Sequence, residues 1–420
     1  MPISRREFLA GTGVAVAAGA SYLMTGPASA TRTITRIRES LAPATLTMWA
    51  NHPEWVRQVA ALVSQFEAQN PGVKIQLTEK PGPSYPTLVT AALAAGSAPN
   101  IFGMAAGGTY LDIAKAGHLH NLTGLIDMSA LLPSATSAMY IGKEVFALPL
   151  LGEYTTGMYY WKSIFAKHGL KPVQTWPEFA DLCKVLLAKG EVPLQMPSSD
   201  GSIPSFFWTG LMTTVRGPDG VAAVAERRAK LTDPDFLAAT EYFKSLVPYF
   251  APGFASTAYI NGKADFAEGK GVMLEGGSAD YTGFVDINPK VDLGFFAFPH
   301  PAGGGVTAVN SGVDLLYGLN SNVTDKAQIA AAVKFFNFFL SAKVGSEVAD
   351  TIELPDTKGA RSKTPIQEEI ISQSTNDAPE WYQFPQLTNM WNYSLLHISQ
   401  MLIGSITPKQ FAAACQAQIQ

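Results

Sequence analysis

The residues best able to do covalent chemistry stand outside the motifs that would activate them. Ser278 lies in the segment GGSAD at residues 276–280, which lacks the second glycine of a nucleophile elbow. The Gly-Lys pairs at residues 262–263 and 269–270 lack the spacing and the following Ser or Thr of a phosphate-binding loop. The sequence therefore predicts no activated serine, and it predicts turns at the two Gly-Lys pairs.

Metal chemistry has equally weak support. His118 and His120 could bind a metal only with acidic or histidine partners from elsewhere, because the chain has no His-Glu-x-x-His motif and no paired cysteines. We therefore expect no metal and no cofactor.

Hydrolysis of a glycosidic bond needs two carboxyl groups about 5 to 9.5 Å apart. Glu153 and Glu275 are the only pair that we could nominate, and nothing in the sequence brings them together. We keep a secreted carbohydrate-active enzyme as the alternative class of protein.

The first 30 residues have the pattern of an export signal. Residues 4–9 (SRREFL) carry the arginine pair of a twin-arginine signal, residues 10–23 are weakly apolar, and residues 28–30 (ASA) fit a signal peptidase. A membrane anchor is the alternative, but glycine, serine and threonine interrupt the stretch, and a bilayer span needs roughly 20 apolar residues. We expect a twin-arginine signal peptide at residues 1–30, cleaved after Ala30, and a mature chain in the periplasm.

Length and composition indicate two compact domains. Without residues 1–30, 390 of the 420 residues remain, enough for two substantial cores. The net charge of −4 includes +1 from the signal, so the remainder lacks the basic surface that nucleic-acid binding needs. Cys183 and Cys415 are too few for a disulfide scaffold, and we expect two unpaired buried thiols rather than one disulfide.

Strands and helices alternate along the chain, which indicates an α/β sheet. Residues 45–49 and 73–77 alternate like strands, and between them apolar residues from Trp55 to Phe66 recur at helical spacing. Helices are expected at 85–95 and 110–116, with a short strand at 99–102 between them. Thr175 and Glu178 form a predicted capping box for a helix that ends near residue 189.

Two further segments complete this prediction. Residues 193–218, which include Phe206 and Trp208, are expected to be rich in loops. Asp325 is expected to cap a helix whose apolar face, Ile329, Val333, Phe336 and Leu340, packs in a core.

Nine segments, taken in order, resemble the family 1 extracellular solute-binding proteins of ABC importers, the maltose-binding type. They are FEAQNPGVKI (66–75), APNI (98–101), GHLHNLT (117–123), ALP (147–149), YYWKSIF (159–165), TWPEF (175–179), FAEGKGVM (266–273), the strand at 294–299, and PQLTNMW (385–391). The resemblance implies an α/β, two-lobed periplasmic-binding-protein fold of type II, with a ligand cleft between lobes joined by hinge strands.

The resemblance also implies where the lobes and hinges lie. The first lobe would comprise residues 31–151 plus 309–355, and the second lobe 152–308 plus 356–420. The crossings would lie near residues 150–153, 309–312 and Pro355. Gly152 and Gly312 are the expected hinge positions, because they tolerate backbone rotation.

The family's cleft positions transfer to particular residues. Glu153 matches an acidic acceptor of sugar hydroxyls, Phe206 and Trp208 match an aromatic lining segment, and Trp391 matches a tryptophan that stacks on a sugar ring. Sugar sites need this mixture because aromatic faces cover the C–H side of the ring while polar groups bind the hydroxyls.

Departures from the family pattern concern the rest of the cleft. Ser278 and Ala279 stand where many relatives carry a stacking tryptophan, so Tyr281 is the expected substitute, and Glu275 lies on the same segment. Asn51, His52 and Glu54 are the expected polar contacts after the first strand.

These features together predict a periplasmic, monomeric binding protein, and not an enzyme, that delivers a mono- or oligosaccharide to a membrane ABC permease. A polyol, a glycerol phosphodiester or another polar solute is the nearest alternative ligand.

The export signal can be tested by replacing both arginines. The substitutions Arg5→Lys and Arg6→Lys should leave the precursor in the cytoplasm, because the twin-arginine system reads the arginine pair whereas a Sec signal tolerates lysine. Immunoblotting of periplasmic and cytoplasmic fractions is the measurement. Normal amounts of mature protein in the periplasm of the double variant would contradict the assignment.

Overall fold

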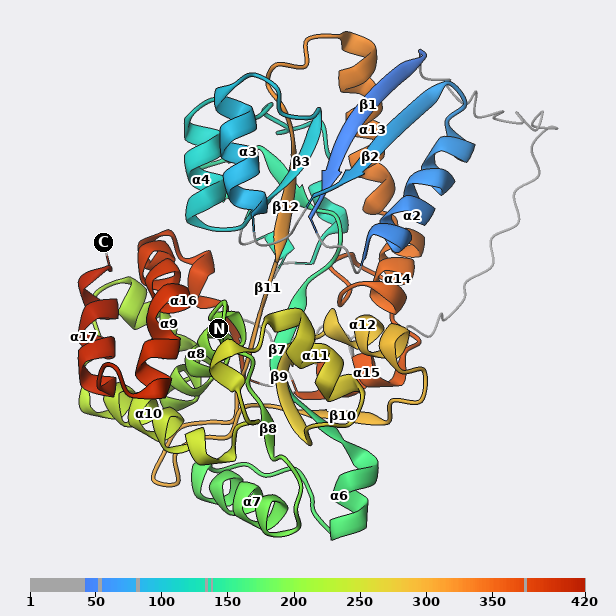
Figure 1. The fold of residues 1–420 in the computed structure, drawn as a ribbon. Coiled ribbons are helices and arrows are strands. Elements are labelled where there is room, and N and C mark those ends of the chain that lie inside the picture. The colour runs from blue at the N-terminus through green and yellow to red at the C-terminus, as the bar shows by residue number, and fades with distance from the viewer. Residues whose placement is uncertain are drawn as a thin grey trace, which may run out of the picture.

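The computed structural model describes residues 42–51, 55–80, 84–132, 135–136, 139–373 and 376–419. The expected export signal at residues 1–30, His52 and Glu54 lie outside these ranges. The described chain forms two lobes, each with its own sheet, helices and apolar core, and the chain passes between them three times (Figure 1).

The first lobe has a five-stranded sheet of order β2-β1-β3-β12-β6. β1 pairs in parallel with β2 and β3, and β12 pairs antiparallel with β3 and β6. Its strands are β1 (Ala44–Ala50), β2 (Val73–Glu79), β3 (Ile101–Ala105), β6 (Ala147–Pro149) and β12 (Leu315–Leu319). Its helices are α2 (Val56–Gln69), α3 (Tyr85–Ala94), α4 (Gly108–Lys115), η2 (Met128–Ala130), α13 (Lys326–Phe339) and α14 (Ala342–Thr351), and a small hairpin joins β4 (Tyr140–Ile141) to β5 (Glu144–Val145).

The second lobe has a six-stranded sheet centred on the long, fully buried strand β7 (Tyr154–Trp161). β9, β10 and β11 all pair antiparallel with β7. The other strands are β8 (Leu194–Gln195), β9 (Met273–Gly277), β10 (Leu293–Phe296), β11 (Val309–Gly312) and β13 (Asp377–Pro379). The helices are α6 (Lys162–His168), α7 (Trp176–Ala188), α8 (Ser202–Arg216), α9 (Pro218–Ala225), α10 (Pro234–Ser245), η3 (Val247–Tyr249), η4 (Phe254–Ser256), α11 (Tyr259–Ala267), α12 (Asp280–Ile287), α15 (Pro365–Gln373), η6 (Trp381–Gln383), η7 (Pro385–Leu387), α16 (Thr388–Ile403) and α17 (Pro408–Ala417).

The three crossings lie side by side. Residues 150–153 lead from β6 to β7, residues 313–314 from β11 to β12, and residues 352–356 leave α14. Glu153 and Leu354 exchange reciprocal backbone hydrogen bonds of 2.9 and 2.8 Å, so the first and third crossings are paired. β11 belongs to the second sheet, and the first sheet resumes only at β12, which moves the expected crossing at 309–312 to residues 313–314.

Most of the predicted elements are confirmed. The strand-helix alternation from β1 to α4 is present, the Thr175–Glu178 capping box forms at the start of α7, and Asp325 caps α13. Both cysteines are buried and unpaired.

Three predictions differ from the structure. Gly262 and Lys263, predicted to form a turn, lie within the helix α11. Residues 202–216 form the helix α8 rather than loops. The buried face of α13 is wider than the predicted stripe. Phe336 and Leu340 are buried as predicted, Ala331, Ala332, Phe335 and Phe339 are buried as well, and Ile329 and Val333 are only partly buried. The reason is that α13 packs against β1 and α14 together, which covers more of its circumference than one apolar stripe.

Across the described residues, no single helix has the length and apolar character of a membrane span. Taken together, the described helices α13 and α14 have that length and apolar character, but the chain bends by 69° between them.

Candidate functional site: a pocket between the lobes

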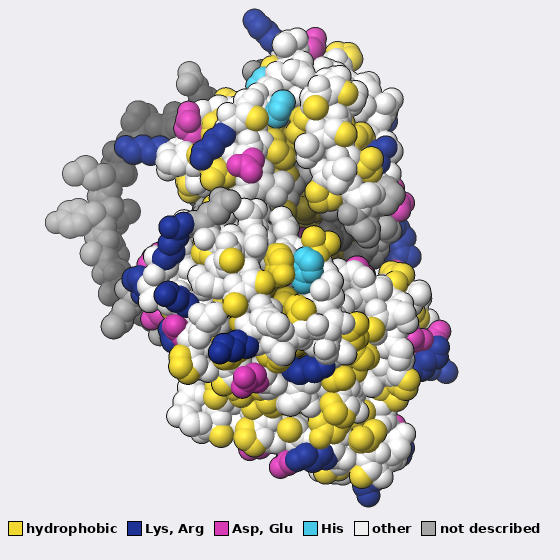
Figure 2. All heavy atoms as spheres, turned by 60° about the vertical axis from the view of Figure 1, so that its left-hand side comes forward, with side chains coloured by type: hydrophobic (Ala, Val, Ile, Leu, Met, Phe, Trp, Pro, Cys, Tyr) yellow, Lys and Arg dark blue, Asp and Glu magenta, His cyan; other side chains and the backbone are white. Residues whose placement is uncertain are grey.

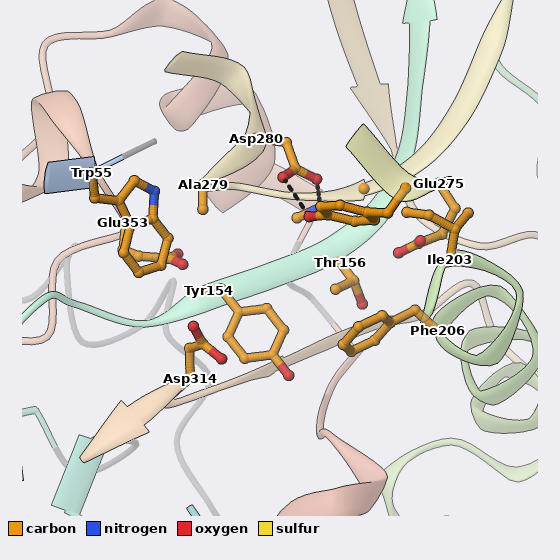
Figure 3. Close-up of a pocket in the computed structure, with 13 residues that line it drawn as sticks. Trp55, Tyr154, Thr156, Ile203, Phe206, Glu275, Ala279, Asp280, Asp314 and Glu353 are labelled. Carbon is orange, nitrogen blue, oxygen red and sulfur yellow. Dashed lines mark hydrogen bonds between the residues drawn. The ribbon is translucent and has the colours of Figure 1, made fainter. Parts of the chain in front are cut away.

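A pocket of about 130 Å³ lies where the two lobes meet. Figure 2 shows that the surface is hollowed along the line between the lobes, with charged side chains scattered over both. The pocket is lined by residues from both cores and from the second and third crossings (Figure 3): Trp55, Tyr154, Thr156, Ile203, Phe206, Tyr259, Glu275, Gly276, Gly277, Ala279, Asp280, Asp314 and Glu353.

Aromatic rings form one wall of the pocket. Tyr154 of β7 and Phe206 of α8 both line it, and their ring centroids are 6.3 Å apart in an edge-to-face arrangement. Behind them, Trp391 of α16 packs 4.8 Å from Phe206, and the Tyr154 hydroxyl donates to that of Tyr382 at 2.7 Å. We call Tyr154, Phe206, Tyr382 and Trp391 the aromatic cluster. Its packing holds the two lining rings in place.

Glu275 of β9 brings a buried carboxyl group to the pocket. The residue is only 1% exposed, and neither carboxyl oxygen accepts a hydrogen bond from any residue that the structure describes. Burial raises the pKa of Glu275 well above its usual range, and the nearby carboxyl groups of Asp280 and Glu380 raise it further, whereas Lys263 opposes the shift. A buried, unpaired carboxyl group is costly, so a ligand that bonds to it would gain free energy there.

Asp280 lies close by but is already engaged. It accepts from the Gly277 backbone N–H at 2.9 Å and forms an ion pair with Lys263, which also contacts the Tyr259 hydroxyl. Asp280 therefore positions the turn between β9 and α12, and its charge is largely balanced by Lys263.

Glu353 ties the third crossing to the pocket wall. Its carboxylate accepts from the Ser278 hydroxyl at 2.9 Å, and Ser278 in turn accepts from the Thr155 backbone N–H at 3.1 Å. Ser278 is fully buried and holds together β7, β9 and the crossing. These hydrogen bonds give Ser278 a structural role.

The sequence-predicted residues take different places around this pocket. Phe206 and Glu275 line it, and Trp391 supports Phe206 from the next layer. Tyr281 is half-buried against the second core and is outside the lining. Asn51, at the end of β1, and Glu153, on the first crossing, are buried but do not line the pocket either.

Trp208 corrects the expectation of a cleft position. Its side chain is fully buried in the second core, its indole N–H donates to the Thr240 hydroxyl at 3.0 Å, and its ring packs on Phe411. Positions two apart on a helix point to nearly opposite sides, so Phe206 and Trp208 cannot both face the pocket.

Gly152 occupies a position that only glycine fits. Its φ is +96°, and an added Cβ would lie 2.4 Å from the Leu354 carbonyl oxygen on the third crossing. At Gly312 an added Cβ would meet the side chain of Gln383. The close approach at Gly152 allows the paired crossings to run side by side. Rotation at either glycine stays a prediction.

Several lining residues were absent from the sequence-based set. Tyr154 and Thr156 follow Glu153 directly, so extending the predicted crossing along β7 would have found them. Asp314, Glu353 and Tyr259 are far apart in sequence, and no local spacing brings them together.

Metal binding finds no support in the described part of the chain. It contains no group of three or more His, Cys, Asp or Glu residues placed to hold a metal ion. His120 is hydrogen bonded to the Val323 carbonyl at 2.8 Å.

The fold and the pocket define a two-lobed α/β binding protein of type II. Residues 61–369 match the profile of the family described as bacterial extracellular solute-binding protein. Because this match spans more than half of the chain, the chain belongs to that family.

Individual relatives are distant but cover most of the chain. A protein of Streptococcus mutans named multiple sugar-binding protein is 23% identical over 73% of this chain and 74% of its own length. The solved structure of a chitin oligosaccharide binding protein matches with a TM-score of 0.78 at 24% identity, covering 90% of this chain and 98% of the other. The receptor AcbH, described as having an exclusive preference for β-D-galactopyranose, matches with a TM-score of 0.77 at 17% identity, covering 89% and 98%.

The carboxyl group of Asp356 predicts a pH dependence of stability. Burial raises its pKa to about 7, although the Thr357 hydroxyl and the Gly152 backbone N–H both donate to it. The unfolded chain releases this proton near the ordinary value of 3.8, so it binds fewer protons than the folded chain between about pH 4 and pH 7. The free energy of unfolding should therefore fall as pH rises through this window.

Asp356→Asn removes this titration. The free energy of unfolding should therefore fall less with rising pH in the variant than in the wild type, by at most about 4 kcal/mol at about 1.4 kcal/mol per pKa unit. Urea unfolding at pH 4 and pH 8 measures it, with Glu241→Gln on the exposed surface of α10 as the control. Equal pH dependence in wild type and Asp356→Asn would contradict the assignment.

Proposed function

We propose that this chain captures a carbohydrate in the periplasm and delivers it to the permease of an ABC importer, as a monomer and without a catalytic step. The observation that carries the proposal is the pocket between the lobes, in which aromatic faces stand beside buried carboxyl groups. Membership of the solute-binding family supports the same conclusion.

The lining suits one sugar ring. The faces of Tyr154 and Phe206 offer apolar contact to ring C–H groups, and Glu275 and Asp314 offer oxygens to ring hydroxyls. Pockets for drug-sized ligands usually have about 300–1,000 Å³. A pocket of about 130 Å³ favours a monosaccharide, or one terminal ring of a longer chain.

The two lobes supply the means of capture. A ligand that contacts both lobes favours the closed arrangement over the open one by the free energy of those extra contacts. Across the lobe boundary, Arg57 of α2 and Asp286 of α12 form an exposed ion pair at 3.0 Å, which contributes little on its own. We propose lobes of residues 31–151 with 313–355 and of 152–312 with 356–420, and rotation near Gly152 and Gly312.

The other candidate ligands have less support. A glycerol phosphodiester carries a negative charge, and no Lys, Arg or His is among the described residues that line the pocket. A polyol lacks the ring face that the aromatic wall would cover.

The enzyme alternative loses its nominated pair of carboxyl groups, because Glu153 is outside the pocket lining while Glu275 is in it. Incubation with aryl glycosides should therefore release no aglycone.

Phe206→Ala tests the pocket directly. A thermal-shift screen of sugars and polyols identifies the ligand, because binding to the native state alone raises the melting temperature. Calorimetry should then give an affinity about 30-fold weaker for Phe206→Ala, equivalent to roughly 2 kcal/mol for a lost aromatic anchor.

Trp208→Phe is the matched control on the same helix. It should lower the free energy of unfolding by about 1–3 kcal/mol, through a cavity and a lost hydrogen bond, and leave the affinity unchanged. An affinity for Phe206→Ala within twofold of wild type would contradict the proposed site.

A further inference from the structure

We infer that the carbohydrate captured here carries a protonated amine, and that the buried carboxyl group of Glu275 receives it. This inference rests on the proposed function and narrows the class of sugar. It stands on the hydrogen-bonding capacity of the lining and on the charges around it.

The lining is rich in acceptors. Glu275, Asp280, Asp314 and Glu353 bring four carboxyl groups to a pocket of about 130 Å³, and no basic side chain is among the described residues that line it. Lys263 lies close by, but it is buried and engaged with Asp280 and the Tyr259 hydroxyl. Among these four carboxyl groups, Glu275 is distinguished because neither of its buried oxygens accepts a hydrogen bond from a described residue.

Besides the indole N–H of Trp55, the side-chain hydroxyl donors of the same lining are already engaged. The Tyr154 hydroxyl donates to Tyr382, the Thr156 hydroxyl donates to Glu380 at 2.9 Å, and the Tyr259 hydroxyl is held beside Asp280 and Lys263. A sugar hydroxyl has one donor and two acceptor lone pairs, so a site for neutral sugars needs several protein donors, and here a protonated Glu275 would add only one to the Trp55 indole N–H. An ammonium group has three donors and no acceptor, which matches this wall.

The aromatic rings favour the same ligand. Phe206 and Tyr154 stand on the wall beside Glu275 (Figure 3), and a cation is attracted to the face of an aromatic ring as well as to a carboxylate. A charge-assisted hydrogen bond in a buried site is roughly twice as strong as a neutral one. A neutral sugar of the same shape would gain neither contribution.

Proton release on binding would follow from this contact. The groups that face Glu275 are Asp280 of α12, Lys263 of α11, Tyr159 of β7 and Glu380 ahead of η6, and burial with the two carboxyl groups raises the pKa of Glu275. An arriving ammonium ion stabilises the ionised carboxylate, so Glu275 should lose its proton to the buffer.

Matched sugars provide the test. Calorimetry at a pH at which the amine is protonated compares D-glucosamine, D-galactosamine and D-mannosamine with the parent hexose and the N-acetyl derivative of each. We expect the amino sugar of the best-binding series to bind at least tenfold more tightly than both neutral partners, with proton release detected in two buffers of different ionisation heat. Glu275→Gln should abolish the preference, and the exposed Glu241→Gln should keep it.

The outcomes separate this inference from the proposed function. If a neutral hexose or N-acetyl sugar binds as tightly as its amino counterpart, the inference is wrong and the proposed function stands. If no sugar of any series binds, the proposed function is contradicted and the inference with it. The selectivity and proton release of the wild type decide the matter even where Glu275→Gln is unstable.

Discussion

The backbone pairing of Glu153 with Leu354 is the contact on which the arrangement of this molecule depends. Each lobe has a complete apolar core, so nothing within either core determines how the two lobes are oriented. The reciprocal hydrogen bonds between the first and third crossings, and the close approach at Gly152, supply that orientation. The pocket forms beside this junction, and Glu353 reaches it from the third crossing itself.

Several carboxyl groups are buried around this junction. Asp356, Glu275 and Glu380 are each almost fully buried, and burial raises the pKa of all three. Such groups stabilise a fold poorly, because desolvation offsets the hydrogen bonds that they make. Glu380 and Asp356 accept hydrogen bonds from the protein, whereas Glu275 has no such partner among the described residues. This contrast separates the groups that join elements of the fold from Glu275, to which we propose that the ligand binds.

Local patterns predicted much of the fold and only part of the site. The periodicity of α2 and the capping box of α7 depend on neighbouring residues, and both were correctly predicted from the sequence. The helix α8 was missed because glycine and threonine weaken its local propensity, whereas the burial of Phe207, Trp208 and Leu211 overrides that preference. Gly210 is needed there, since an added Cβ would lie 2.4 Å from the Phe298 ring. Asp314 and Glu353 join the pocket only through the crossings, which no spacing reveals.

We propose that a ligand bound between the lobes holds them closed. Small-angle X-ray scattering of residues 31–420, with and without a saturating amount of the sugar that raises the melting temperature most, measures this directly. We expect a smaller radius of gyration and a shorter maximum dimension with the sugar, at unchanged mass. Identical scattering curves at saturation would contradict closure and would indicate a rigid pocket.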